Sequence, residues 1–213
     1  MHGLNKYFKL IYKDMMIQKG ILLLAALYVL MPCFINNDMY RSNLFIVTNM
    51  IIVSEITFAN IAYFYLEERS KGNLLLITTS YTRSDVVVSK YLFLMALGLV
   101  QLLASYCIVY ANLGPQILST KSLYDFILNI LFLSVEVAFV TPLCFFKLSA
   151  LAKTFVACMV CSVIECLPMM VSFDGFIYAL NLNWVCIFGL LVSAAVVCGS
   201  IFVSNKVFKS RDF

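Results

Sequence analysis

The sequence predicts an all-α membrane protein with six transmembrane helices in a single domain, residues 1–213. Its composition is the first reason: the chain is 63% hydrophobic and only 12% charged, whereas soluble domains are about 45–50% apolar and about 25% charged. The second reason is that the apolar residues gather into stretches near the length of about 20 residues that crosses a bilayer. A soluble domain and a disordered chain are therefore excluded.

Six apolar stretches are long enough, or nearly so, to be spans. They cover residues 21–35, 44–66, 91–113, 126–146, 150–172 and 182–204. The first is short, because Pro32 and the pair Asn36 and Asn37 end it. The net charge of +4 is small and the basic residues flank the stretches, so no nucleic-acid partner is expected.

The basic residues also predict the orientation. Thirteen of the fifteen Lys and Arg residues flank the stretches on one side, and only Arg41 and Lys121 lie on the other. Because Lys and Arg are enriched in cytoplasmic loops, we expect both termini to be cytoplasmic in a multi-pass protein of the plasma membrane.

Residues 1–19 have the pattern of an amphipathic interfacial helix. Its apolar positions are expected to face the lipid and its lysines the anionic headgroups. The apolar positions are Leu4, Tyr7, Phe8, Ile11 and Met15, and the lysines are Lys6, Lys9 and Lys13. A simple extension of the first span is the alternative.

The eight cysteines lie in or beside apolar stretches and are expected to pack as small hydrophobic side chains. Cys158 and Cys161 have a CxxC spacing, but His2 is the sole histidine and no second CxxC is present. We therefore expect no metal site.

The segment 67–90 is the longest polar part of the chain. Thr82 and Asp85 have capping-box spacing, which predicts a helix start ahead of the third span. The apolar residues 74–77 are too few to cross a bilayer and fit a short helix at the membrane surface, where a soluble partner could push on the membrane domain.

This segment resembles the permeases of bacterial ABC-2-type transporters, the small membrane subunits of ABC exporters. The residues that carry the resemblance are Glu67, Glu68, Arg69, Ser70 and Lys71, followed by Arg83, Asp85, Val86, Ser89, Lys90 and Tyr91. Ser80 stands where the family often has a proline. The layout of a basic amphipathic start, six spans and both ends inside is also similar.

The resemblance implies a permease that depends on a separate ATP-binding subunit. The chain itself has no GxxxxGK[ST] phosphate loop, and an enzyme is not expected. In such a transporter two permease subunits, identical or different, join two ATPase subunits, which use ATP and Mg²⁺, and the chain needs no cofactor of its own. The residues implied in coupling are Glu67, Glu68, Arg69, Leu74, Leu75, Ile77, Arg83, Asp85 and Lys90. The alternative is that these charges only anchor helix ends at the headgroups.

The function that this implies is export of a peptide-like or amphipathic substrate from a bacterial cell, in contact with membrane lipids. A small solute-binding subunit of an uptake system is the alternative. Its outer loops would have to be polar enough to close over a ligand, and here the outer loops are short.

Three acidic residues, Glu55, Glu136 and Glu165, fall inside apolar stretches. Because an ionised carboxylate at mid-span costs about 2.5–3.5 kcal/mol, each should face a partner, a cavity or a subunit interface. One hypothesis is that they line a translocation path. The other is that they only hydrogen-bond helices together. Ala195 and Gly199 in the last stretch have the small-xxx-small spacing of a helix-packing face.

Overall fold

The computed structural model describes residues 2–20, 23, 27, 37–70, 81–113, 120–170 and 181–210. Those residues form helices and connecting turns, with no strand among them. The first predicted span, residues 21–35, lies outside this part of the chain except for Leu23 and Leu27, and so does the apolar segment 74–77.

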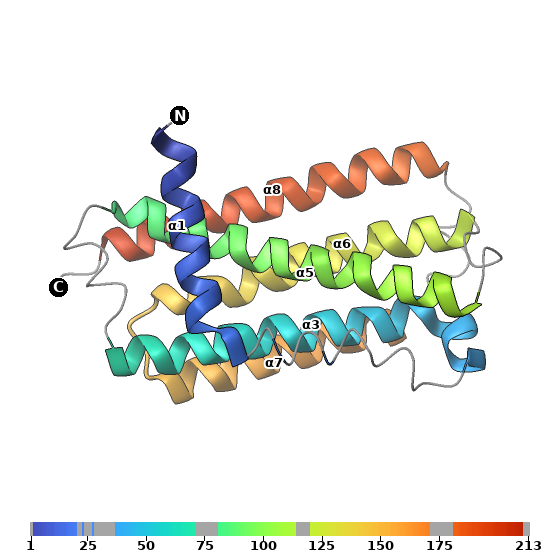
Figure 1. Cartoon of the computed structure of the whole chain (residues 1–213), viewed down its shortest axis with the longest axis horizontal. Helices are drawn as coiled ribbons and strands as arrows, with labels where there is room; N and C mark the ends of the chain where they lie inside the picture. The colour runs from blue at the N-terminus through green and yellow to red at the C-terminus, as the bar shows by residue number, and fades with distance from the viewer. Residues whose placement is uncertain are drawn as a thin grey trace.

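Within the described ranges, five long helices run lengthwise in one bundle and a sixth helix crosses it (Figure 1). The lengthwise helices are α3 (Asn37–Ser70), α5 (Arg83–Leu113), α6 (Thr120–Val140), α7 (Ala150–Met170) and α8 (Leu182–Lys209). The crossing helix is α1 (His2–Ile17), and a short 3₁₀ turn, η2 (Thr141–Phe145), continues α6. The closest packing pairs α6 with α8 and α3 with both α6 and α7.

Among the residues that the structure describes, four helices are long and apolar enough to cross a membrane. The candidate spans are Thr48–Leu66, Arg83–Ile108, Leu123–Phe145 and Leu182–Lys209. Each corresponds to a predicted apolar stretch. Helix α7, with 21 residues, extends over about 30 Å and lies beside α3 in the bundle. Six spans in total stays a prediction, because α7 is not among the four candidate spans and, apart from Leu23 and Leu27, residues 21–35 lie outside the described part of the chain.

Helices cover both ends of the segment 67–90. Helix α3 continues to Ser70, and α5 begins at Arg83, as the spacing of Thr82 and Asp85 predicts, so Lys90 lies within α5. A helix can extend beyond its apolar stretch, because polar residues at its ends lie in the headgroup region and its backbone hydrogen bonds continue there.

Helix α6 lies inside the bundle and α8 on its side. Of the candidate spans, 67% of the α6 segment is buried but only 6% of the α8 segment. The main core joins residues of α3, α5, α6, η2 and α8, including Ile56, Tyr91, Leu133, Phe145 and Phe208. Helix α8 thus exposes a long apolar surface to its surroundings.

The faces of α1 differ from the prediction. Leu10, Asp14 and Gln18 point into the bundle and are almost fully buried. Phe8 and Tyr12 are exposed, as a lipid-facing side requires. Lys6 pairs with Asp85 of α5 instead of facing outward, whereas Lys13 pairs with its chain neighbour Asp14 and Lys9 is exposed.

Close helix contacts occur at glycines that the sequence analysis did not single out. A Cβ atom on Gly98 would lie 2.4 Å from Leu133 Cδ1, and one on Gly189 would lie 2.9 Å from Ile127 Cγ2. A Cβ on Gly199 would meet nothing within 4 Å. The predicted packing role of Gly199 is therefore wrong within this chain, since its position is open.

Candidate functional site

The first candidate site is the end of the bundle at which α1 crosses. Helix α3 ends there, α5 begins there and α8 ends there (Figure 1). The same end carries most of the residues that the sequence analysis assigned to coupling, on either side of residues 71–80.

The first turn of α5 has the predicted capping box. The Thr82 backbone N–H donates to Asp85 Oδ2 at 2.7 Å, and the Asp85 N–H donates to Thr82 Oγ1 at 3.2 Å. Each residue thus satisfies a backbone donor that the helix itself leaves unpaired. The chain therefore enters α5 with a fixed geometry directly after residues 71–80.

Asp85 also forms an ion pair with Lys6 of α1. The Lys6 ammonium donates to the same carboxylate oxygen, Oδ2, and lies 5.6 Å from the centre of the Tyr81 ring. The side chains of Lys6 and Asp85 are 31% and 12% exposed, so the pair is only partly screened by solvent. This contact attaches the N-terminal helix to the start of α5.

Arg83 attaches the same turn to the end of α8. Its guanidinium Nη1 donates to the Lys209 carbonyl at 2.7 Å and to the Phe208 carbonyl at 3.2 Å. The last carbonyls of a helix lack intrahelical partners and carry partial negative charge, so a cation there is favourable. The first turn of α5 is therefore bound to both α1 and α8.

Lys90 is buried at 3% exposure, two turns into α5. Its Nζ lies 3.5 Å from the centre of the Tyr63 ring on α3, a close cation–π contact. The coupling role of Lys90 stays a prediction. Its contact with Tyr63 was not predicted, because nothing in the sequence gives the register between α3 and α5.

Glu68 joins the end of α3 to the start of α7. Its Oε2 accepts a hydrogen bond from the Ala150 backbone N–H at 3.2 Å, where a helix N-terminus favours an acidic partner. The side chains of Glu67 and Arg69 lie outside the described residues, as do Leu74, Leu75 and Ile77.

The second candidate site is a group of polar side chains inside the bundle, where two of the three intramembrane acids meet α3. Thr57 donates to Glu136 Oε1, and Ser54 donates to Glu165 Oε1 at 2.8 Å. Glu136 comes from α6 and Glu165 from α7, and the two carboxyl groups lie close enough to interact electrostatically. We call these four residues the carboxyl group cluster.

Glu55 stands apart from this cluster. It is 1% exposed, and neither of its carboxyl oxygens has a hydrogen-bond partner among the described residues. The predicted path contains all three acids, whereas the structure brings together only Glu136 and Glu165. Ser54 and Thr57, which were not predicted to belong to the site, supply the hydroxyl groups.

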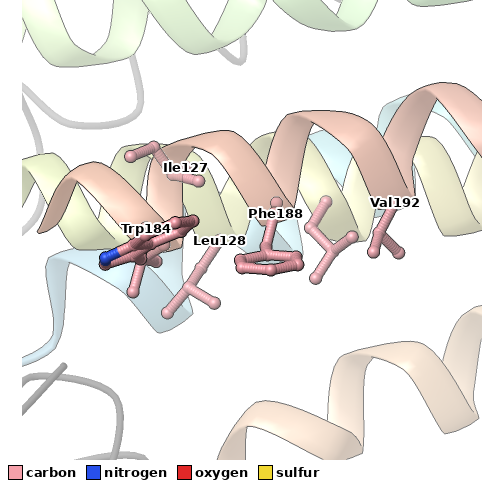
Figure 2. A pocket seen from close by; sticks show the side chains of 8 residues that line it. Ile127, Leu128, Trp184, Phe188 and Val192 are labelled. Atoms are coloured by element: carbon pink, nitrogen blue, oxygen red, sulfur yellow. The ribbon is translucent and has the colours of Figure 1, made fainter. Parts of the chain in front are cut away.

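An apolar groove lies between α6 and α8. It has a volume of about 450 Å³ and is lined by Ile127, Leu128, Leu131, Trp184, Val185, Phe188, Gly189 and Val192. Figure 2 shows Trp184, Phe188 and Val192 of α8 along it, with Ile127 and Leu128 of α6. Its lining has no charged side chain that could fix a polar ligand.

The cysteines within the described residues are all free thiols. In the same part of the chain, no three His, Cys, Asp or Glu side chains converge as metal ligands would.

Comparison with known proteins identifies the family. The family model for ABC-2 family transporter proteins matches residues 9–209. The chain belongs to the ABC-2 transporter family. The match covers nearly the whole chain, including α3, α5 and the segment between them, and it agrees with the resemblance found in that segment. No curated protein and no solved structure matches the chain.

Members of the ABC-2 family are membrane components of transporters and imply an ABC ATPase partner in general. The family and the apolar helices together identify a multi-pass membrane protein. The membrane component is not itself the catalytic part of such a transporter.

Proposed function

We propose that this chain is the permease of an ABC exporter and that a separate ATP-binding subunit drives it through the segment 67–90. The observation that carries this proposal is the binding of the first turn of α5 to two other helices, through Lys6–Asp85 and through Arg83 and the carbonyls of Phe208 and Lys209. A displacement of residues 71–80 by the ATP-binding subunit would be transmitted to α1, α5 and α8 together. Anchoring at headgroups alone would need no such internal contacts.

The remaining features follow the family pattern. Two ATPase subunits would bind ATP and Mg²⁺, and two permease subunits, identical or different, would form the membrane part. The thirteen basic residues on one side support cytoplasmic termini in a bacterial plasma membrane, with six spans. The carboxyl group cluster would then lie within the bilayer, where a peptide-like or amphipathic substrate could meet it. The family match favours this permease over a solute-binding uptake subunit.

Crosslinking tests the coupling assignment. Single cysteines replace Leu75 or Ile77 in a chain without its native cysteines, and the complex is purified with its ATP-binding subunit. We expect both variants to form a crosslink to that subunit. Trp184→Cys, at the opposite end of α8, is the control and should form none. A functional complex without any crosslink from positions 75 and 77 would refute the assignment.

A further inference from the structure

Tyr91 connects α5 to α8 and α6 through a chain of hydrogen bonds. Its hydroxyl oxygen lies 2.5 Å from Ser200 Oγ and 2.8 Å from Ser204 Oγ, on two residues one turn apart in α8. Ser200 in turn donates to the backbone carbonyl of Ala138 on α6 at 2.6 Å. Tyr91 is 1% exposed. We call the three hydroxyl groups and the Ala138 carbonyl the Tyr91 node.

The number of hydrogens fixes the direction of this chain. A hydroxyl group has a single hydrogen to donate, whereas a carbonyl can only accept. Since Ser200 donates to Ala138, the Tyr91 hydroxyl donates to Ser200, and Ser204 donates to Tyr91. Loss of the Tyr91 hydroxyl alone would therefore remove both hydrogen bonds between α5 and the two serines.

Pro142 explains why the chain ends at the Ala138 carbonyl. In an α-helix this carbonyl accepts from the N–H of the residue four positions later, and a proline there has no N–H to donate. Pro142 lies in η2, where α6 changes into a 3₁₀ turn. Within a membrane, hydroxyl groups can satisfy a carbonyl that a proline has left without its donor. Ser200 of α8 therefore supplies the donor that α6 lacks at its break.

The node gives α5 a second attachment to α8. Arg83 binds the carbonyls of Phe208 and Lys209 at the end of α8. Tyr91 lies eight residues farther, about 12 Å along α5, and binds the same helix, which runs in the opposite direction (Figure 1). One attachment would let α8 pivot about its end, whereas two attachments fix its direction relative to α5.

The node also lies beside the carboxyl group cluster. Glu136 precedes Ala138 by two residues, about 3 Å along the axis of α6, and it accepts a hydrogen bond from Thr57 of α3. A movement of α6 at the Ala138 carbonyl would therefore change the position of Glu136 relative to α3.

We propose that Tyr91 is a positioning residue of the transporter, whose hydroxyl transmits the movement of α5 to α8 and to the break in α6 at Pro142. This rests on the proposed function, because the movement comes from the ATP-binding subunit through the segment 67–90. A displacement of the first turn of α5 moves Tyr91 with it. The node then carries Ser200 and the Ala138 carbonyl in the same direction, and Glu136 follows.

A double-mutant cycle tests the node in the full chain without the ATPase. The midpoint of unfolding by SDS is read from circular dichroism in detergent micelles. Ser200→Ala should lower the midpoint. In a Pro142→Ala background, which restores the N–H donor to Ala138, the same change should cost about half as much or less. The control is Ser162→Ala, whose hydroxyl donates within α7 and which should behave alike in both backgrounds. Equal losses from Ser200→Ala in both backgrounds would overturn the role of Pro142.

A second cycle leaves Pro142 in place. Tyr91→Phe removes only the hydroxyl, and Ser204→Ala removes one of its partners. Because the two changes break the same hydrogen bond, the double variant should lose less than the sum of the single losses. Additive losses would overturn the node itself.

Distances between spin labels test the transmission in the complex with its ATP-binding subunit. The native cysteines are replaced, and labels are attached to exposed positions in pairs. Tyr65→Cys with Val100→Cys reports α3 relative to α5, and Tyr65→Cys with Leu191→Cys reports α3 relative to α8. Pulsed electron paramagnetic resonance gives both distances with and without ATP and Mg²⁺.

We expect ATP to change both distances in the parent protein. In Tyr91→Phe the α3–α5 change should persist, whereas the α3–α8 change should fall by about half or more, because Arg83 alone lets α8 pivot. The control is Tyr106→Phe, which removes a hydroxyl of α5 that accepts from Asn129 and should leave both changes intact. An undiminished α3–α8 change in Tyr91→Phe would overturn the positioning role. If ATP changed neither distance in the parent protein, the coupling assignment would fail instead, so the two failures are distinguishable.

Discussion

The ammonium of Lys6 in α1 and the carboxylate of Asp85 in α5 form an ion pair across 79 positions of the chain. The same Asp85 oxygen accepts the hydrogen bond from the Thr82 backbone N–H. One carboxylate thus both starts α5 and holds α1 in place. Both functions lie directly beside the segment that we assign to the ATPase.

Reversing the charge of Lys6 should weaken the attachment of α1. We expect Lys6→Glu to lower the free energy of unfolding by about 1 kcal/mol, because the pair is partly exposed and a like charge would then face Asp85. ATP hydrolysis by the purified complex should fall as well. Lys9→Glu makes the same charge change at an exposed position of α1 and is the control. The exchange Lys6→Asp with Asp85→Lys should restore part of the loss; equal behaviour of the two single variants would contradict the pairing.

Removing the Thr82 hydroxyl should destabilise the start of α5. Thr82→Ala is expected to cost about 1 kcal/mol, as is typical for loss of an N-cap side chain. Thr82→Ser keeps the hydroxyl and should remain near the wild-type stability. Denaturant unfolding in detergent would measure both. If Thr82→Ser lost as much as Thr82→Ala, the hydroxyl would not be the cause.

The Arg83 contact predicts local protection at the end of α8. Arg83→Ala should increase hydrogen exchange of the amides near residues 204–209 without affecting those near Trp184, because local opening depends on local contacts. Arg83→Lys should protect the amides near residues 204–209 from exchange only partly, since an ammonium does not reproduce the planar fork of donors of a guanidinium. Mass spectrometry of peptic peptides would report both regions in one experiment. Unchanged exchange near 204–209 would show that other contacts hold the helix end.

Gly98 should tolerate no side chain. A Cβ there would lie 2.4 Å from a methyl group of Leu133, which is fully buried. We expect Gly98→Ala to cost about 1–3 kcal/mol by overpacking. Gly199→Ala meets nothing within 4 Å and should be neutral or slightly stabilising, because alanine favours helix. Adding Leu133→Ala to Gly98→Ala tests the mechanism: the double variant should lose less stability than the sum of the two single changes, and simple additivity would exclude the contact.

Glutamine variants test the role of the intramembrane acids. Glu136→Gln and Glu165→Gln keep an oxygen that can accept the hydrogen bonds from Thr57 and Ser54, but they remove the ionisable group. If the acids line a translocation path, export by each variant should fall severalfold at equal protein level. Glu55→Gln completes the series. Undiminished export in all three would leave the acids with a packing role only.

The sequence predicted the elements of the fold better than their contacts. Apolar length identified the candidate spans, and the Thr82–Asp85 spacing located the start of α5, because both signals are local. The partners of Glu136 and Glu165 depend on how α3, α6 and α7 are rotated and aligned, which no local pattern encodes. The outward orientation predicted for Lys6 was wrong because an amphipathic pattern does not reveal an acidic residue 79 positions away. The packing role predicted for Gly199 failed within this chain for a similar reason: small-residue spacing identifies a helix face but does not show whether another helix covers it.

Helix α8 has 28 residues, a length of about 42 Å, whereas the hydrocarbon core of a typical bilayer is about 30 Å thick. Its polar last residues, 204–209, carry the helix out of that core, and with Arg83 holding this end the helix cannot slide along its axis, so a change in bilayer thickness must be met by tilt or by local deformation of the lipid. Most of its surface is exposed in the described structure. The thickness of the host bilayer therefore affects the tilt of α8 and, through Arg83, the position of the first turn of α5.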